Sequence, residues 1–283
     1  MRMFYRVALK VCPPLALLFS VVVTASTMYI EEGISPLLLF VCVQVYLNWY
    51  CIYSISKNAT TMKSTGKRSK SVAISITVEH NTKEEIRQSA EGRYKFWYCD
   101  KCCCYTYKPT QHCIPCKKCF HYRDHHCFFV GSCVLRQNMG NFILVCFHTS
   151  LACLYSLSVI GPRLNENISR RIAQSPSSQT FPRFLHSCFP VALARLLILG
   201  EDTDILLVIL FDALFSVFFM CSFYGAWKFY ICIIGKQRYY PHVPTRQNVK
   251  EIFGSYGLWN VVFPYNGLLG SRDIDGKFEL KEV

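Results

Sequence analysis

Between Cys99 and Cys133 the sequence reads C-x2-C-x9-H-C-x2-C-x2-C-x4-D-H-H-C-x5-C, and strongly apolar segments lie on both sides of this run. Cysteine thiolates and histidine imidazoles at such short spacings are typical ligands of Zn²⁺. Apolar segments of about 20 residues are long enough to cross a bilayer. The combination therefore points to a chain that binds metal ions and lies in a membrane.

The run holds more ligands than two zinc sites require. Apart from Cys127, the candidates are Cys99, Cys102, Cys113, Cys116, Cys119, Cys133, His112, His125 and His126. Three thiolates and one imidazole complete a tetrahedral site, so two sites leave one histidine and Cys127 unused. The unused pair belongs to the tetrapeptide Asp124-His125-His126-Cys127. A thiol near an imidazole and a carboxylate is the arrangement that makes thiolate available near neutral pH.

Composition places the chain in a membrane. Of its 283 residues 52% are hydrophobic and only 17% are charged, which is too apolar for an ordinary soluble domain. A bilayer requires spans of about 20 apolar residues. Four such spans are predicted, from Val11 to Ile30, Ile34 to Ser54, Phe142 to Ile160 and Ile205 to Ile234. The apolar segment 184–199 contains Arg195, so we expect it to lie at the interface or to re-enter the membrane.

The expected fold class is an all-α integral membrane protein with four transmembrane helices and a cytosolic cysteine-rich domain that binds two zinc ions. Five parts are predicted along the chain. They are a first transmembrane hairpin at 1–55, a cytosolic linker at 56–92, the cysteine-rich zinc domain at 93–141, helices three and four with a lumenal loop at 142–234, and a cytosolic tail at 235–283.

Basic residues predict the orientation of the chain. The loop between the second and third spans is rich in lysine and arginine, so by the positive-inside rule it faces the cytosol. Four spans then leave both termini on the same side. Within this loop the cluster from Lys63 to Lys70 is interpreted as part of a solvated linker, with an anionic-lipid site as the alternative. Cytosolic thiols stay reduced, so metal and catalysis explain the central cysteines better than disulfides do.

The net charge of +13 is compatible with several kinds of partner. Zinc ligands together with lysines are found in nucleic-acid-binding proteins, but the apolar spans make the lipid bilayer, with its anionic lipids, the expected partner. We therefore expect no nucleic acid.

At this point the residues show a family resemblance. The run resembles the cysteine-rich domain of the DHHC protein S-acyltransferases, the palmitoyltransferases, with Asp124-His125-His126-Cys127 as the signature. Asn138 and Phe142 also match family positions. The tail, with Phe263-Pro-Tyr-Asn-Gly-Leu-Leu-Gly and Asp275-Gly276, resembles that of a divergent branch numbered twenty-four in the mammalian series, which likewise lacks Pro-Trp after the signature.

The resemblance implies an activity and a site. Cys127 takes a long-chain acyl group such as palmitate from acyl-CoA and passes it to cysteines of membrane-associated substrate proteins, while His125 accepts the thiol proton and Asp124 orients the imidazole. The acyl chain lies in a groove among the helices with its floor near Ala152. One structural zinc ion is assigned to Cys113, Cys116, His126 and Cys133, and the other to Cys99, Cys102, His112 and Cys119. The implied location is the endoplasmic reticulum or the Golgi.

The sequence departs from the family pattern at several positions. Phe128 and Phe129 replace Pro and Trp, Ser132 replaces Asn, and Thr245-Arg246-Gln247-Asn248 replaces the Thr-Thr-x-Glu of the tail. The altered tail favours an alternative, a catalytically weak DHHC-like scaffold that binds or retains membrane proteins. A membrane-anchored zinc adaptor without chemistry is a third possibility. Asp124, His125 and Cys127 are intact and favour the enzyme.

Overall fold

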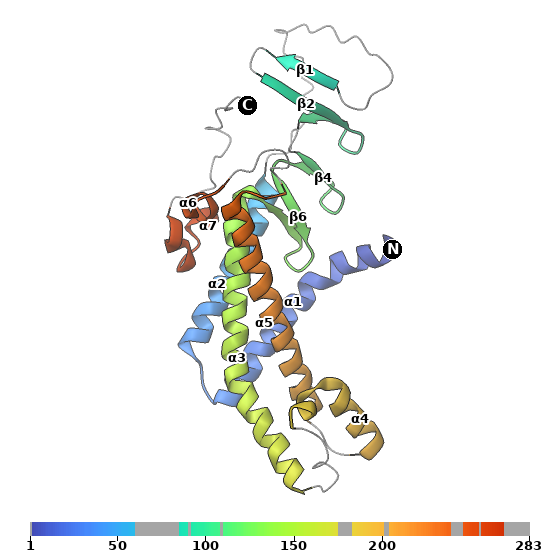
Figure 1. The fold of residues 1–283 in the computed structure, drawn as a ribbon, viewed down its shortest axis with the longest axis vertical. Coiled ribbons are helices and arrows are strands. Elements are labelled where there is room, and N and C mark those ends of the chain that lie inside the picture. Colours follow the sequence, from blue (N-terminus) through green and yellow to red (C-terminus); the bar gives the residue numbers. More distant parts are fainter. Residues whose placement is uncertain are drawn as a thin grey trace. The chain divides into compact units, whose positions relative to one another are not determined.

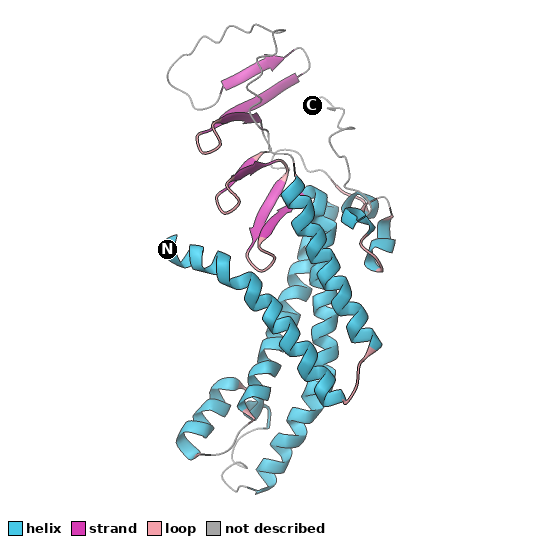
Figure 2. Cartoon of the chain, turned by 180° about the vertical axis from the view of Figure 1, so that it is seen from behind, coloured by secondary structure: helices cyan, strands magenta, loops and turns pink. Residues whose placement is uncertain are grey.

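The computed structural model describes residues 2–59, 85–89, 92–107, 110–174, 183–200, 204–238, 246–254 and 256–268. The chain divides into two compact units. The first unit comprises Met1–Lys10, Tyr50–Asn141 and Ile231–Val283, and the second comprises Val11–Trp49 and Phe142–Tyr230. Figure 1 labels the elements, and Figure 2 separates the helices from the strands by colour.

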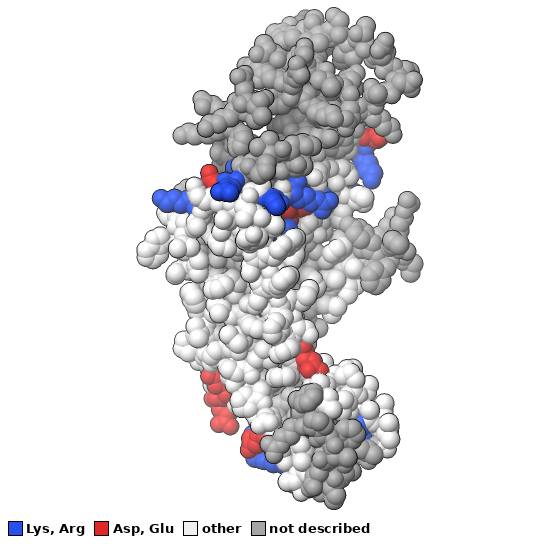
Figure 3. All heavy atoms as spheres, viewed as in Figure 1, with Lys and Arg blue, Asp and Glu red and all other residues white. Residues whose placement is uncertain are grey.

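Four helices are long and apolar enough to cross a membrane. They are α1 (Arg2–Glu31), α2 (Pro36–Asn58), α3 (Met139–Gln174) and α5 (Ile205–Ile234). Charged side chains are scarce along the middle of these helices (Figure 3). The predicted helical membrane architecture is confirmed, although α3 continues 14 residues beyond the predicted end at Ile160.

Helices α1 and α2 are joined by a tight connection. Glu32 adopts a left-handed conformation with φ 57° after the last turn of α1. Ser35 begins α2, because its Oγ accepts the backbone N–H of Leu38 at 3.4 Å. Pro36 then occupies the first helical position, where its missing N–H costs no hydrogen bond.

Small and hydroxyl side chains join the helices of the second unit. Thr27 Oγ1 of α1 donates to Ser156 Oγ of α3 at 3.0 Å, and Ser150 of α3 and Ser222 of α5 share a hydrogen bond of 2.8 Å. A Cβ on Gly225 would lie 2.8 Å from the Cβ of a cysteine on α3. Such close approach is how helices pack in lipid, where apolar burial gives no driving force.

The interrupted apolar segment forms the short helix α4 (Phe189–Leu199), which follows the 3₁₀ helix η3 (Arg183–Ser187). Its 11 residues are too few to cross a bilayer. The carboxylate of Asp212 on α5 accepts the backbone N–H of Phe189 at 2.8 Å. An acid within the fourth span therefore satisfies the first turn of α4.

Short antiparallel hairpins build the cysteine-rich region of the first unit. Strands β1 (Glu85–Ser89), β2 (Gly92–Cys99) and β3 (Cys104–Tyr107) form one sheet, β4 (Gln111–Cys113) pairs with β5 (Lys118–Phe120), and β6 (Arg123–Cys127) pairs with β7 (Ser132–Leu135). A 3₁₀ turn, η1 (Arg136–Asn138), connects β7 to α3. Hairpins this short bury little apolar surface and need other links to hold them together.

The tail forms three short elements, α6 (Val249–Phe253), η4 (Gly257–Val261) and α7 (Tyr265–Leu268). Asn248 begins α6 through a capping box. Its Oδ1 accepts the backbone N–H of Glu251 at 2.8 Å, and the Glu251 carboxylate accepts that of Asn248 at 2.9 Å. The asparagine at the family's glutamate position thus starts a helix. The division into five parts stays a prediction, and most of the linker lies outside the described residues.

Candidate functional site

The first of two Cys/His clusters joins two hairpins. Cys99 ends β2, Cys102 lies in the turn after it, and His112 of β4 is directly opposite Cys119 of β5. The Nδ1 of His112 lies 3.5 Å, 3.2 Å and 3.7 Å from the sulfurs of Cys99, Cys102 and Cys119. All four ligand atoms lie within 4.8 Å of one another.

The second cluster repeats this plan one hairpin later. Cys113 ends β4, Cys116 lies in the next turn, and His126 of β6 is directly opposite Cys133 of β7. The Nδ1 of His126 lies 3.6 Å, 3.4 Å and 3.7 Å from the sulfurs of Cys113, Cys116 and Cys133. The structure therefore brings together the same two sets of four residues that the resemblance assigns.

Both clusters have the dimensions of a tetrahedral zinc site. With ordinary zinc bond lengths, two sulfurs on one ion lie about 3.8 Å apart, and a sulfur and a nitrogen about 3.6 Å apart. The Cys116 and Cys133 sulfurs are 3.6 Å apart, as are those of Cys102 and Cys119. The donor set and its dimensions fit Zn²⁺, and either cluster could hold one ion.

The electrostatics of the second cluster also suit a cation. Hydrogen bonds from Cys116 and Cys133 hold the pKa of the Cys113 thiol well below its usual range. The same bond to Cys113 raises the pKa of Cys116 to about 11. Protons and negative charge are thus shared among three sulfurs, and a metal ion would displace the remaining protons.

Arg123 balances the charge of this cluster. Its guanidinium interacts with the sulfur of Cys133, and although burial opposes the charged form, the neighbouring thiols keep the pKa of Arg123 above its ordinary value. A zinc ion with three thiolates and one imidazole carries a net charge of about −1. A partly buried arginine beside it offsets that charge.

A bulge in β6 shapes the signature tetrapeptide. Arg123 pairs with Leu135 and His125 with Val134, so Asp124 is the extra residue between two consecutive pairs. Bulges re-aim side chains and are common beside active sites. Side chains of consecutive residues in a regular strand point to opposite faces, but the bulge allows those of Asp124 and His125 to contact each other. The His125 Nδ1 donates a hydrogen bond to Asp124 Oδ2, and the two atoms are 2.7 Å apart. Asp124 is only 3% exposed.

Strand alternation separates the two histidines. His125 and Cys127 lie two positions apart on β6 and share one face, while His126 between them points to the other face and joins the metal cluster. Because Asp124 holds Nδ1, Nε2 is the nitrogen of His125 that can accept a thiol proton. The hairpin thus carries a candidate metal ligand on one face, and the thiol of Cys127 and the imidazole of His125, bonded to Asp124, on the other.

Comparison with known proteins agrees with this arrangement. Residues 93–239 match the family model described as DHHC palmitoyltransferase. The chain belongs to this family. The mouse palmitoyltransferase ZDHHC22 is 31% identical over 163 residues, which are 55% of this chain and 59% of the mouse protein. The human ZDHHC22 is 28% identical, again over 55% of this chain and 59% of the human protein. Protein S-acyltransferase 8 of Arabidopsis thaliana is 34% identical over 35% of this chain and 23% of its own length.

The matched region spans 59% of the length of the mouse and human relatives. The predicted family is confirmed. These relatives carry the number 22, so the particular branch numbered twenty-four stays a prediction.

Two DHHC-family positions have structural roles that sequence reasoning did not find. Asn138 is fully buried; its Oδ1 accepts the N–H of Leu135 at 2.7 Å, and its Nδ2 donates to the carbonyls of Cys133 at 3.1 Å and Ile52 at 3.2 Å. It therefore joins the strand that bears Cys133 to α2.

Gln247 in the altered tail motif is 5% exposed, and its backbone N–H donates to the Cys232 carbonyl at the end of α5.

The other departures from the DHHC pattern lie around the same hairpin. Phe128 packs edge-on against His126, with ring centroids 6.2 Å apart, and Phe129 is 64% exposed in the turn that follows Cys127. Ser132 pairs with Cys127 across the hairpin and is buried. Thr245 lies outside the described residues.

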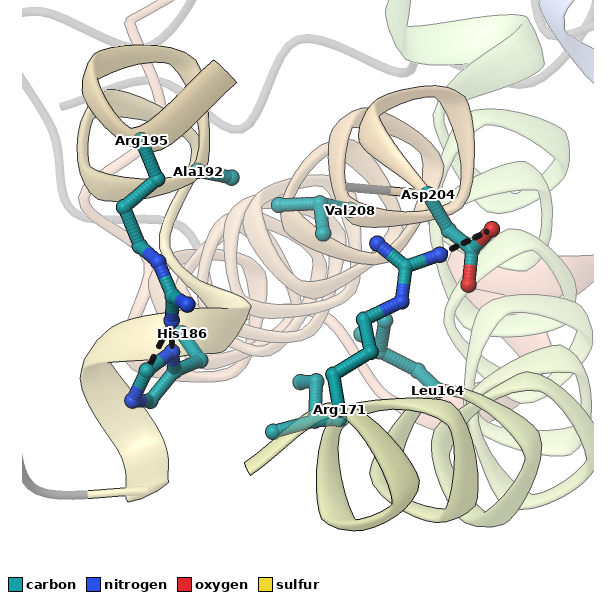
Figure 4. A pocket seen from close by; sticks show the side chains of 8 residues that line it. Leu164, Arg171, His186, Ala192, Arg195, Asp204 and Val208 are labelled. Atoms are coloured by element: carbon teal, nitrogen blue, oxygen red, sulfur yellow. Dashed lines mark hydrogen bonds and ion pairs between the residues drawn. The ribbon is translucent and has the colours of Figure 1, made fainter. Parts of the chain in front are cut away.

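A cavity in the second unit does not belong to this site (Figure 4). It lies among α3, η3, α4 and α5, and its charged groups are paired with one another. Arg171 forms an ion pair with Asp204 at 2.9 Å, and Arg195 is hydrogen-bonded to His186. Because these side chains are paired, the apolar segment that contains Arg195 can pack as the short helix α4.

Proposed function

We propose that this protein is a protein S-acyltransferase that moves a long-chain acyl group, such as palmitate, from acyl-CoA to cysteines of membrane-associated proteins. The observation that carries the proposal is the contact between Asp124 and His125 on the strand that also bears Cys127. A carboxylate that fixes an imidazole beside a thiol is the arrangement that activates a nucleophile.

The proposed reaction proceeds in two transfers. His125 Nε2 takes the proton of Cys127, and the thiolate attacks the thioester carbonyl of acyl-CoA. The bond from the acyl carbon to the CoA sulfur breaks, and CoA leaves with the proton returned by His125. A substrate cysteine then gives its proton to His125 and attacks the acyl-enzyme, which restores Cys127. Asp124 stabilises the charged imidazole in both steps.

The two clusters are proposed to hold structural Zn²⁺ ions. Each offers four protein ligands, which closes a tetrahedral site to substrate. Bound zinc would link the hairpins and so hold β6 in shape. Catalysis is assigned to Cys127, His125 and Asp124, and metal binding to the eight cluster residues.

The proposed orientation places the cysteine-rich region in the cytosol. Helix α2 follows Glu31 and Glu32 and has Lys57 in its last turn, while α5 follows Asp204 and is followed by Lys236. Basic residues near one end of each helix and acidic residues near the other agree with the positive-inside rule. The endoplasmic reticulum or the Golgi is the expected compartment. The proposed acyl groove has its floor near the half-buried Ala152 on α3.

Incorporation of a clickable palmitate analogue tests the proposal. The purified wild type and Cys127→Ser would be compared at equal zinc content, with Cys103→Ser as control because Cys103 is exposed and belongs to neither cluster. We expect hydroxylamine-labile label in the wild type and in Cys103→Ser but not in Cys127→Ser. Equal label in all three, or none, would favour the scaffold.

A further inference from the structure

The tail is fixed to α5 and α2 within the first unit. The Gln247 N–H donates to the Cys232 carbonyl at 3.1 Å, and the Gln237 side chain donates to the same carbonyl at 2.8 Å. Gly267 of α7 lies so close to α2 that a Cβ there would meet the Cβ of Cys51 at 2.9 Å. Both ends of the tail segment therefore contact membrane-length helices.

A third contact fixes α6 to α3. Gly140, in the first turn of α3, has no room for a Cβ against the backbone carbonyl of Ile252. Ile252 and Phe253 are buried. The tail therefore contacts the first turn of α3, the last two turns of α2 and the last turn of α5.

The outer side of η4 carries a stripe of large apolar residues. Tyr256, Trp259 and Val262 are 54%, 71% and 53% exposed, and Leu258 beside them is 65% exposed. The first three follow one another at intervals of three residues. Side chains at this interval lie one above the other on a 3₁₀ helix, so they form a continuous face.

The opposite side of η4 is packed. Gly257 and Asn260 are buried, and the Asn260 amide donates to the Gly257 carbonyl at 3.0 Å. Behind the stripe, the ring of Tyr265 stacks on that of Tyr256 with centroids 4.6 Å apart. The stripe is therefore presented outward by an ordered support.

The described part of the tail carries mostly positive charge, and Lys250 lies next to Gly257 of η4. Among the described residues from 235 onward the cations are Lys236, Arg238, Arg246 and Lys250, and the only acid is Glu251. Tryptophan, tyrosine and aliphatic side chains flanked by lysine and arginine are the composition of segments that lie at the membrane interface.

We propose that Tyr256, Leu258, Trp259 and Val262 insert into the headgroup–acyl boundary of the leaflet at this end of the helices, so that η4 is an interfacial anchor of the tail. The contacts of α6 and α7 hold η4 beside the ends of apolar helices, and the cations of the tail suit anionic lipid. This anchor does not depend on the proposed acyl transfer. A partner protein or a second copy of this chain is the competing occupant.

Tryptophan quenching in nanodiscs tests the anchor. The full chain would be placed, one copy per disc, in phosphatidylcholine with phosphatidylserine, and the Trp259 emission obtained as the difference between wild type and Trp259→Phe. Brominated lipids would carry the quencher near the headgroup or near the bilayer centre. We expect shallow bromines to quench roughly half of this emission and deep ones much less, because interfacial tryptophan lies at the headgroup level. Trp227→Phe is the matched control, since Trp227 is 45% exposed on α5.

A second variant moves the probe along the stripe. Tyr256→Trp in the Trp259→Phe background should show the same preference for shallow bromines. The proposal is wrong if aqueous acrylamide quenches Trp259 as freely as a soluble tryptophan while brominated lipids do not. It is also wrong if Trp259 is shielded only in discs that hold two copies, which would assign the stripe to self-association.

Discussion

Asp124 and His125 are hydrogen-bonded to each other at a bulge in β6, where Asp124 is the extra residue between two consecutive pairs of the strand ladder. In a regular strand, consecutive side chains point to opposite faces. The bulge overrides this alternation at one residue only, and His126 returns to the metal face. The same five-residue strand thus supplies a metal ligand and the proposed catalytic residues.

The Asp124–His125 bond predicts the effect of Asp124→Asn. The amide cannot stabilise a charged imidazole, so formation of the acyl-enzyme should slow by about 100-fold or more while the zinc content stays at the wild-type level. Single-turnover release of CoA measures this rate. Asp100→Asn is the control, because Asp100 is exposed in the turn between the first cluster's cysteines. An unchanged rate in Asp124→Asn would remove Asp124 from the proposed mechanism.

The opposite faces of His125 and His126 predict a clean division between two alanine variants. His126→Ala should lose one of two zinc ions and lower the thermal midpoint, because a three-ligand site binds zinc weakly. His125→Ala should keep both ions and lose acylation. Elemental analysis of purified protein together with the palmitate assay separates the two. Zinc loss in His125→Ala would show that the faces are assigned wrongly.

Arg123 predicts a charge effect on the second cluster alone. Arg123→Gln removes the cation that interacts with the Cys133 sulfur, so zinc should leave this cluster faster by about 10-fold or more. The release of zinc to a chromogenic chelator should change from one kinetic phase in the wild type to two in Arg123→Gln, because the substitution leaves the surroundings of the first cluster unchanged. Lys117→Gln, on the exposed turn beside Cys116, serves as control. A single phase at the wild-type rate in Arg123→Gln would contradict the assigned role.

The sequence predicts the helices, and the short spacing of the cysteines and histidines predicts that they cluster, for a physical reason. Membrane spans follow from hydropathy over 20 or so consecutive residues, and the spacing of candidate ligands is a local property of turns and hairpins. Apolar character alone therefore located α5 at both ends and α2 to within four residues, whereas α1 begins nine residues before the predicted start at Val11. It placed the end of α3 too early, because the helix continues past Pro162 into a polar segment that no bilayer rule describes. The division of the candidate ligands into two sets of four came from the family resemblance.

Other features depend on contacts between distant residues. The bond between Asp212 and the first N–H of α4 joins positions 23 apart, and that between Asn138 and Ile52 joins positions 86 apart. Local pattern carries no signal for either. The spacing of three among Tyr256, Trp259 and Val262 is visible in the sequence, but its meaning requires the 3₁₀ conformation of η4 and its exposed side.

Asn138 gives the last prediction. Its amide makes three hydrogen bonds in a fully buried position, to Leu135, Cys133 and Ile52. Asn138→Ala leaves these backbone groups unsatisfied, at a cost of about 1–3 kcal/mol for each group that stays buried. The thermal midpoint in detergent should fall, and hydrogen exchange should rise first at Leu135, whose N–H loses its acceptor. Asn165→Ala, on the exposed side of α3, is the control. If the two variants unfold at the same temperature, Asn138 does not join the strand that bears Cys133 to α2 in the way its contacts indicate.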